Sequence, residues 1–129
     1  EQTPLLSSRF TSPSISNTKD SDRIHKVLEF IMKNFTKEIY VPQIASMLNM
    51  SNPSFSRYFK HHTRKTFSGY VSEIRISYAC QLLMHGEESV ARIGYMSGFE
   101  NLSNFYRHFR EITGLTPKEY RQRFLQLSK

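Results

Sequence analysis

The sequence predicts an all-α fold of seven helices, which form two helix-turn-helix units joined by a long linker helix. Three observations lead to this prediction. Apolar residues recur at amphipathic-helix spacing along most of the chain. Glycine, asparagine and serine stand where these apolar patterns stop or start, as is typical of helix ends. A twelve-residue pattern also occurs twice, at an offset of fifty residues.

The N-terminal 19 residues show no sustained period. They are rich in Ser and Thr, contain two prolines, and are predicted to be a disordered linker or tail. The folded domain is predicted to cover residues 20–129. Asp20 or Ser21 is expected to cap its first helix. The apolar positions of that helix follow helical spacing: Ile24, Val27, Leu28, Ile31, Met32 and Phe35.

The first helix-turn-helix unit is predicted at about 41–62. Pro42 suits the first turn of a short helix, because first-turn amides have no partner within the helix. Asn49 is expected in the turn, and Ser51 is expected to cap the second helix. A long apolar stripe then predicts the linker helix at about 67–85, ended by Gly86. Its apolar positions are Tyr70, Val71, Ile74, Tyr78, Leu82 and Leu83.

The second unit is predicted at about 89–113. Val90, Ile93 and Met96 share one helical face, and Gly98 follows as the turn. Gly114 is expected to end the second helix of this unit. The apolar face of that helix is predicted to consist of Phe105, Phe109 and Ile112. A capping box is predicted to open the last helix, with Thr116 as N-cap, Pro117 at N1 and Glu119 at N3.

The two units repeat one pattern. Residues 55–66 and 105–116 both contain Phe, Arg, Phe, a basic residue, Thr and Thr at the same spacing. Upstream, each unit has a small residue on its first helix (Ala45 or Gly94), and such residues let two helices approach closely. By the same comparison Arg64 corresponds to Gly114 and is expected to adopt a left-handed backbone conformation.

The composition indicates a partner with negative charge. The formal net charge is +7, and the first twenty residues contribute none of it, because they hold two basic and two acidic residues. No apolar run is long enough to cross a membrane, and no signal peptide is visible. Cys80, the single cysteine, excludes an internal disulfide and agrees with a cytoplasmic location.

Patterns typical of enzymes and metal sites are absent from the sequence. The five histidines have no metal-binding spacing, and no catalytic or phosphate-binding motif occurs. We therefore predict no enzyme activity, no metal and no cofactor. Eight of the ten phenylalanines are candidates for stacking on single-stranded bases: Phe10, Phe35, Phe55, Phe59, Phe99, Phe105, Phe109 and Phe124. Most of them lie on apolar helical faces, so we interpret them as core.

An amphipathic helix with one buried edge and a polar, basic outer face suits the major groove of double-stranded DNA. The second helix of each unit has this character. Arg57 and Arg107 point away from the core and are predicted to donate to guanine, whereas Lys60 and Arg110 are predicted to contact phosphate. The alternative is that both arginines contact only phosphate. The predicted DNA-binding residues are Asn52, Ser54, Ser56, Arg57, Lys60, His61, Asn101, Ser103, Asn104, Tyr106, Arg107 and Arg110.

At these residues the chain resembles the DNA-binding half of AraC/XylS-type bacterial transcription regulators, from about residue 22 to 124. Arg64, Gly94 and Pro53 depart from the pattern, where the family usually has Gly, Ala and a base-facing side chain. The matching positions are Ser51, Phe55, Phe59, Lys60, Arg75, Ala79, Leu82, Leu83, Ile93, Gly98-Phe99, Phe105, Phe109, Gly114, Thr116-Pro117 and Tyr120-Arg121.

The resemblance implies a transcription activator that associates with the nucleoid and contacts RNA polymerase. It also implies an upstream effector-binding domain in the parent protein. The chain begins with Glu1 rather than Met, and we interpret it as a fragment of that protein. A helical protein-interaction domain with an acidic partner is the rival hypothesis. The two differ in that only sequence-specific DNA binding keeps a sequence preference at high salt.

Overall fold

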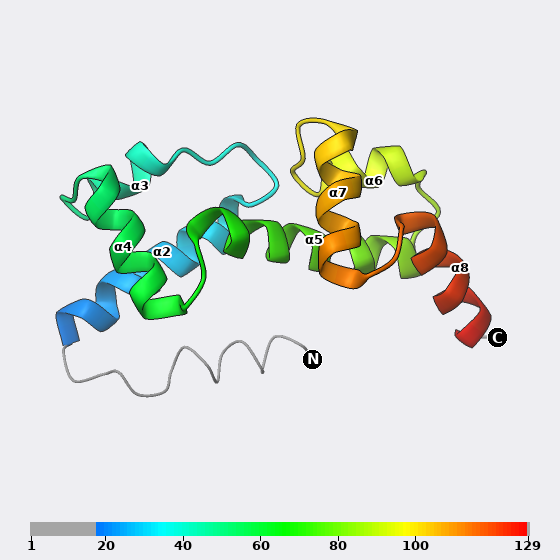
Figure 1. Cartoon of the computed structure of the whole chain (residues 1–129), viewed down its shortest axis with the longest axis horizontal. Helices are drawn as coiled ribbons and strands as arrows, with labels where there is room; N and C mark the ends of the chain where they lie inside the picture. Colours follow the sequence, from blue (N-terminus) through cyan, green and yellow to red (C-terminus); the bar gives the residue numbers. More distant parts are fainter. Residues whose placement is uncertain (1–17, 129) are drawn as a thin grey trace. The chain divides into compact units, whose positions relative to one another are not determined.

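The computed structural model describes residues 18–128, and side chains from residue 21 to residue 125. This part of the chain contains seven α-helices and no strand, as predicted (Figure 1). The helices are α2 (Thr18–Asn34), α3 (Val41–Met47), α4 (Asn52–Thr63), α5 (Phe67–His85), α6 (Val90–Met96), α7 (Leu102–Thr113) and α8 (Pro117–Ser128).

Helix α2 begins before the predicted cap. The tail predicted at residues 1–19 lies outside the described residues up to residue 17, whereas Thr18 and Lys19 already belong to α2. Met32 was expected on the apolar face of α2 but is 54% exposed. It lies about 100° around the helix from the direction shared by the three buried residues, at about 100° per residue. Those three are Ile24, Val27 and Ile31.

The chain forms two compact units. Unit 1 comprises α2 together with residues 39–67, and unit 2 comprises residues 35–38 together with residues 68–128. Each unit has its own apolar core. The core of unit 1 contains Ile24, Val27, Ile31, Ile44, Ala45, Leu48, Phe55, Phe59 and Phe67. The core cluster of unit 2 contains Ile76, Ala79, Leu83, Ile93, Phe99, Phe105 and Phe109.

Helix α5 has the predicted bounds but buries more of its surface than the predicted stripe. Ile76, which lies outside that stripe, is only 1% exposed, whereas Tyr78 and Leu82 are half-buried. Phe67, the first residue of α5, packs its ring against Phe55 and Phe59, with centroid distances of 5.6 and 5.3 Å. The start of α5 therefore closes the core of unit 1.

Arg75 on α5 holds residues 35–38 in unit 2. Its Nε donates to the carbonyl of Phe35 at 2.7 Å, and its Nη2 donates to the carbonyl of Lys37 at 2.9 Å. The guanidinium also lies 5.9 Å from the ring centroid of Phe99. Burial lowers the pKa of Arg75, and the charge of Glu100 opposes that shift. One side chain thus joins a segment that precedes α3 to the turn between α6 and α7.

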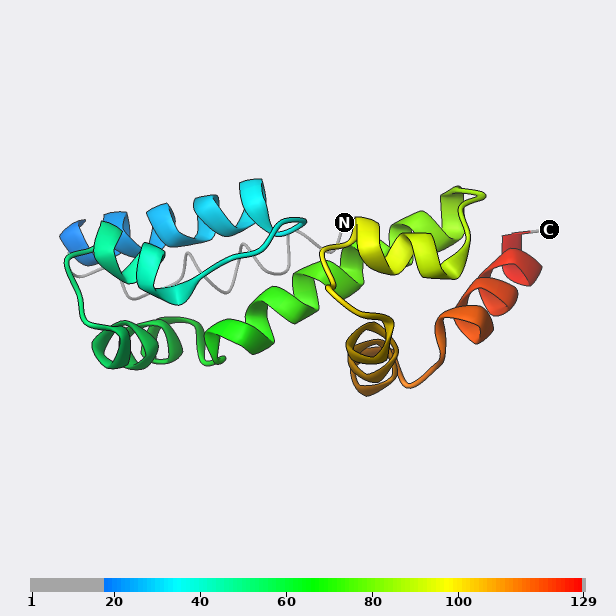
Figure 2. The same cartoon turned by 90° about the horizontal axis from the view of Figure 1, so that it is seen from above.

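Helices α6 and α7 cross steeply, and Figure 2 shows α7 nearly end-on and α6 from the side. The two helices also approach closely. A Cβ atom added at Gly94 would lie 2.7 Å from the Phe105 ring and 3.1 Å from Leu102. Phe105 and Phe109 are fully buried, as predicted. Ile112, predicted on the same face, is instead 42% exposed, because it lies in the last turn of α7 and outside the core cluster.

Helix α8 is fixed at its start and along its length. The predicted capping box is present: Thr116 N–H donates to Glu119 Oε1 at 2.9 Å, and Glu119 N–H donates to Thr116 Oγ1 at 3.1 Å. Further along, Arg121 donates to the carbonyls of Leu83 and Gly86, at 3.1 and 3.3 Å. These bonds tie α8 to the end of α5.

Candidate nucleic-acid interface

The second helix of each unit starts with the same kind of cap. In both helices a side-chain oxygen accepts from the backbone N–H three residues later, at 3.2 Å from Ser51 Oγ in α4 and 2.8 Å from Asn101 Oδ1 in α7. Asn101 is one of the predicted DNA-binding residues. Its oxygen is occupied by this cap, which leaves its NH₂ group available outside the helix.

The two helices also end alike. A threonine hydroxyl donates to the carbonyl four residues earlier and accepts from the N–H two residues later. These distances are 2.9 and 3.2 Å at Thr63, and 2.8 and 3.0 Å at Thr113. The next residue is left-handed in both helices, with φ of 65° at Arg64 and 82° at Gly114. The left-handed conformation predicted for Arg64 is confirmed.

The turns before these helices have different lengths. Four residues separate α3 from α4, whereas five separate α6 from α7. Each turn contains one residue with positive φ, which is 58° at Asn49 and 108° at Gly98. The predicted turn residues therefore hold the positions expected of them. The extra residue explains why the first helices of the units repeat at an offset of 49 residues and the second helices at 50.

All twelve predicted DNA-binding residues lie in or next to α4 and α7. Eleven of them are exposed, and Ser54 is half-buried. In α4 the structure brings Arg57, Lys60 and His61 together around one shallow hollow. Arg64 also lines this hollow but was not among the predicted residues. Its place at i+7 from Arg57, on the same helical face, is the signal that could have found it.

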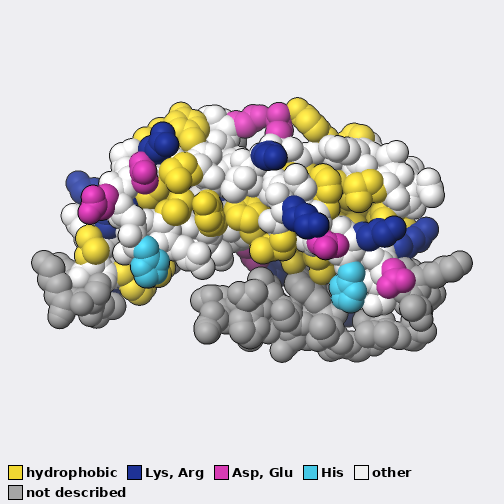
Figure 3. Space-filling model, turned by 180° about the vertical axis from the view of Figure 1, so that it is seen from behind, with side chains coloured by type: hydrophobic (Ala, Val, Ile, Leu, Met, Phe, Trp, Pro, Cys, Tyr) yellow, Lys and Arg dark blue, Asp and Glu magenta, His cyan; other side chains and the backbone are white. Residues whose placement is uncertain are grey.

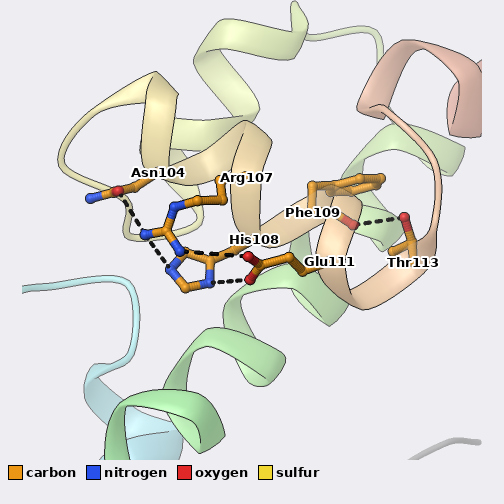
Figure 4. A network of polar contacts seen from close by, with 6 residues as sticks. All are labelled: Asn104, Arg107, His108, Phe109, Glu111 and Thr113. Carbon is orange, nitrogen blue, oxygen red and sulfur yellow. Dashed lines mark hydrogen bonds and ion pairs between the residues drawn. The ribbon is translucent and has the colours of Figure 1, made fainter.

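In α7 the side chains form a polar network around Arg107 (Figure 4). Nη2 of Arg107 donates to Asn104 Oδ1 at 3.1 Å and lies 3.5 Å from His108 Nε2. Nη1 lies 3.8 Å from a carboxylate oxygen of Glu111. The other carboxylate oxygen is 3.9 Å from His108 Nδ1. His108 and Glu111 were not among the predicted DNA-binding residues, although their spacing of i+1 and i+4 from Arg107 is visible in the sequence.

His108 in this network favours its neutral form. Burial and the nearby charge of Arg107 lower the pKa of its imidazole, while Glu111 opposes the shift. Its ring also stacks on Phe99, with the centroids 5.8 Å apart. A neutral imidazole adds no charge to α7 near neutral pH, so the positive charges of this helix belong to Arg107 and Arg110.

The face of the protein opposite to that of Figure 1 has a mixed character. In each unit its Lys and Arg side chains are interspersed with acidic and hydrophobic ones (Figure 3). The basic side chains around the hollow in α4 differ from this pattern, because they belong to consecutive turns of one helix. Within the described residues, no helix is long and apolar enough to cross a membrane.

A family model described as a helix-turn-helix domain matches residues 44–123, which include α4 to α7 completely and all but the first three residues of α3. The chain belongs to the AraC family. AraC-family proteins are DNA-binding transcription regulators, so membership identifies this chain as a DNA-binding domain and not as an enzyme.

Two relatives of this AraC-family chain are regulators. The chain is 31% identical over 125 residues to the MmsAB operon regulatory protein of Pseudomonas aeruginosa, covering 97% of this chain and 38% of the relative. It is 30% identical over 100 residues to the transcriptional activator RhaS of Enterobacter sp., covering 78% of this chain and 36% of the relative. The chain thus spans less than two fifths of each relative's length.

A solved structure has the same fold. The DNA-binding domain of AdpA, a global transcriptional factor solved in complex with a target DNA, superposes with a TM-score of 0.74. The superposition covers 79% of this chain and 92% of that domain, at 24% sequence identity. This likeness shows that the described helices have the same fold as that domain.

Proposed function

We propose that this chain binds double-stranded DNA sequence-specifically, with α4 in one major groove and α7 in the next, and that it thereby activates transcription. The observation that carries the proposal is the repeated framework of cap, threonine bridge and left-handed residue around α4 and α7. Because the cap, the threonine hydrogen bonds and the left-handed residue are all repeated, α4 and α7 are held in the same way. We therefore expect both helices to bind the same kind of partner. The AdpA domain bound to its target DNA and the RhaS activator support the same reading.

The length of α5 supports binding in successive grooves. Its 19 residues measure roughly 28 Å at about 1.5 Å per residue. Recognition helices in adjacent major grooves on one DNA face lie about 34 Å apart. The helix is of that order but shorter, so the proposal includes DNA bending or helix tilting to close the difference.

Within each groove we assign base contacts to Arg57 and Arg107, which are exposed near the middle of their helices. Arginine donates two hydrogen bonds to guanine O6 and N7. Lys60 and Arg110 lie one turn further along and are assigned to phosphates. Around them the remaining predicted residues complete the two surfaces: Asn52, Ser54, Ser56, His61, Asn101, Ser103, Asn104 and Tyr106.

The proposal also names the setting of this domain. The chain would act in the bacterial cytoplasm, on the nucleoid when bound to DNA. RNA polymerase is the proposed protein partner. Because the relatives are more than twice as long as the matched part, we propose that the parent protein carries an effector-binding domain upstream.

The test uses the spacing between the half-sites. A binding site selected from random DNA should contain two half-sites about 10 bp apart. Inserting about 5 bp between them turns one half-site to the opposite face and should abolish tight binding by the single chain, whereas inserting about 10 bp restores the face and changes only the distance. Binding is measured by fluorescence anisotropy. Undiminished binding to the 5 bp insertion would overturn two-groove reading, and failure to select any sequence would overturn specific binding itself.

A further inference from the structure

Helices α4 and α7 share a framework but differ in charge. Residues 51–66 contain four Lys or Arg and no acidic residue, whereas residues 101–116 contain two Arg and one Glu. The Glu is Glu111, and its counterpart fifty residues earlier is His61. The formal charges are therefore +4 for the first stretch and +1 for the second. Glu111 is the only acidic residue of either stretch.

Glu111 is placed to neutralise Arg107. It lies one helical turn beyond Arg107, with its carboxylate 3.8 Å from the guanidinium and 3.9 Å from the His108 ring. Its side chain is 60% exposed and that of Arg107 is 55% exposed, so both face solvent on the surface assigned to DNA. The Nε–H and one Nη1–H of Arg107 take no part in this network, but they lie on different edges of the guanidinium. A two-bond contact with guanine therefore also uses an Nη2–H, which must leave Asn104 or His108.

The stability of α7 does not explain this carboxylate. Glu111 lies in the last turn of α7, where the helix dipole disfavours negative charge. An exposed ion pair contributes little to stability in return. On a surface that approaches phosphates, the carboxylate is also repelled by the DNA. An acidic residue is therefore unfavourable here both for the helix and for affinity.

We propose that Glu111 is a specificity-determining residue that suppresses non-specific DNA binding through α7. The inference rests on the proposed function, in which α7 enters a major groove. On DNA that lacks guanine at the matching position, a phosphate is the charged partner left for Arg107, and Glu111 competes with the phosphate for it. At the correct site the guanine edge is uncharged, so Glu111 does not repel it as it repels a phosphate, and binding there is retained. The unit 1 helix, with no such acid, binds phosphates on any sequence.

The competition between Glu111 and a phosphate for Arg107 can be measured from the salt dependence of DNA binding. Each phosphate neutralised by a cation adds about −0.9 to the slope of log K against log salt concentration. Glu111→Gln removes the competing charge and keeps the size of the side chain. Binding to random duplex DNA should then become roughly three- to tenfold tighter at low salt, with a slope more negative by about 0.9. Binding to the selected site should change by less than about twofold, so the specificity ratio falls.

Two matched variants separate the local effect from net charge. Glu29→Gln removes an acid from another exposed i,i+4 pair, with Lys33 on α2, outside both helix-turn-helix units. It makes the same change in net charge and should leave the specificity ratio unchanged. His61→Glu places a carboxylate one turn beyond Arg57, as Glu111 stands to Arg107. It should weaken random-sequence binding and reduce the slope by about one unit.

The experiment measures anisotropy with the full 129-residue chain on a selected site and on a random duplex, from about 50 to 200 mM salt. Thermal melting confirms that each variant is folded. If Glu111→Gln shifts random-sequence affinity no more than Glu29→Gln does, the inference is wrong. If it changes which base is selected, Glu111 reads a base and the inference is equally wrong. A wild-type chain that prefers no sequence would instead overturn the proposed function.

Discussion

The two helix-turn-helix units hold their second helices by the same hydrogen bonds, but their turns meet different surroundings. In unit 1 the turn residue Asn49 is exposed. In unit 2 a Cβ atom at Gly98 would overlap the Phe35 carbonyl oxygen and lie 2.7 Å from Arg75 Nε. The repeated features are those that a helix needs in itself, namely its cap and its end. The features that differ are those in which each unit contacts the rest of the chain.

The largest effect is expected from a variant that removes this difference between the two turns. Gly98→Asn gives unit 2 the turn residue of unit 1, where φ is 108° and the Phe35 carbonyl blocks the side chain. Overpacking costs about 1–3 kcal/mol and a strained backbone adds about 1–3 kcal/mol, so unfolding free energy should fall by about 3 kcal/mol or more. Asn49→Gly should change it by less than about 1 kcal/mol. Urea denaturation measures the unfolding free energy of both variants. Equal losses of unfolding free energy would show that the contacts around the two turn residues do not matter.

The helix contacts give a second comparison. The side chain of Ala45 in unit 1 is buried, with 1% of its surface exposed. At the equivalent Gly94, an added Cβ atom would lie only 2.7 Å from the Phe105 ring. Ala is favoured over Gly within a helix by about 1 kcal/mol. Overpacking a dense core costs about 1–3 kcal/mol. Gly94→Ala should therefore destabilise by about 1 kcal/mol net in urea denaturation, and a stabilised variant would show that Phe105 moves aside freely.

The two assigned arginines should affect base selection in separate half-sites. Arg107→Ala should relax preference at one or two base positions of one half-site, with a loss of about 1–3 kcal/mol of discrimination. Arg57→Ala should do so in the other half-site, and less strongly, because Pro53 stands where a base-facing side chain can project. Lys60→Ala should weaken all sequences alike. Repeating the site selection with each variant is the measurement, and an unchanged motif at lower affinity would assign Arg107 to phosphate.

The smallest effect concerns the helix ends. Arg64 and Gly114 are both left-handed, and only glycine adopts that conformation without a steric cost. Arg64→Gly should stabilise the chain by about 1 kcal/mol and slightly weaken non-specific DNA binding, because a cation leaves the hollow. A thermal melt and a titration with random duplex give the two values. A lower melting temperature would mean that Arg64 contributes contacts worth more than its strain.

Local signals account for what the sequence predicted well. The Ser51 cap, the capping box at Thr116 and the left-handed Arg64 depend on residues within one or two turns of each other. The repeat added strength, because each unit could be checked against the other. Every candidate DNA-binding residue lies in or beside α4 and α7. Their contacts with DNA stay predictions.

Two predicted core positions are exposed for different reasons. Met32 lies about 100° around α2 from the buried direction, and Ile112 lies in the last turn of α7, outside the core cluster. Arg75 bonds to a carbonyl 40 residues away, which no local pattern records. Glu111 was not among the predicted DNA-binding residues. Its pairing with Arg107 becomes visible only once side chains are placed.

The segment held by Arg75 gives the two units an interleaved connectivity. The chain leaves unit 1 after Asn34, contributes residues 35–38 to unit 2, returns for residues 39–67 and then completes unit 2. No single cut separates the units, because residues 35–38 of unit 2 lie between two segments of unit 1. A chain ending at residue 67 would also lack Arg75, which donates to the carbonyls of Phe35 and Lys37. During synthesis, residues 35–38 must wait for α5 to emerge before they find their partners. Exchange of one unit between homologues would therefore require residues 35–38 to be exchanged together with α5.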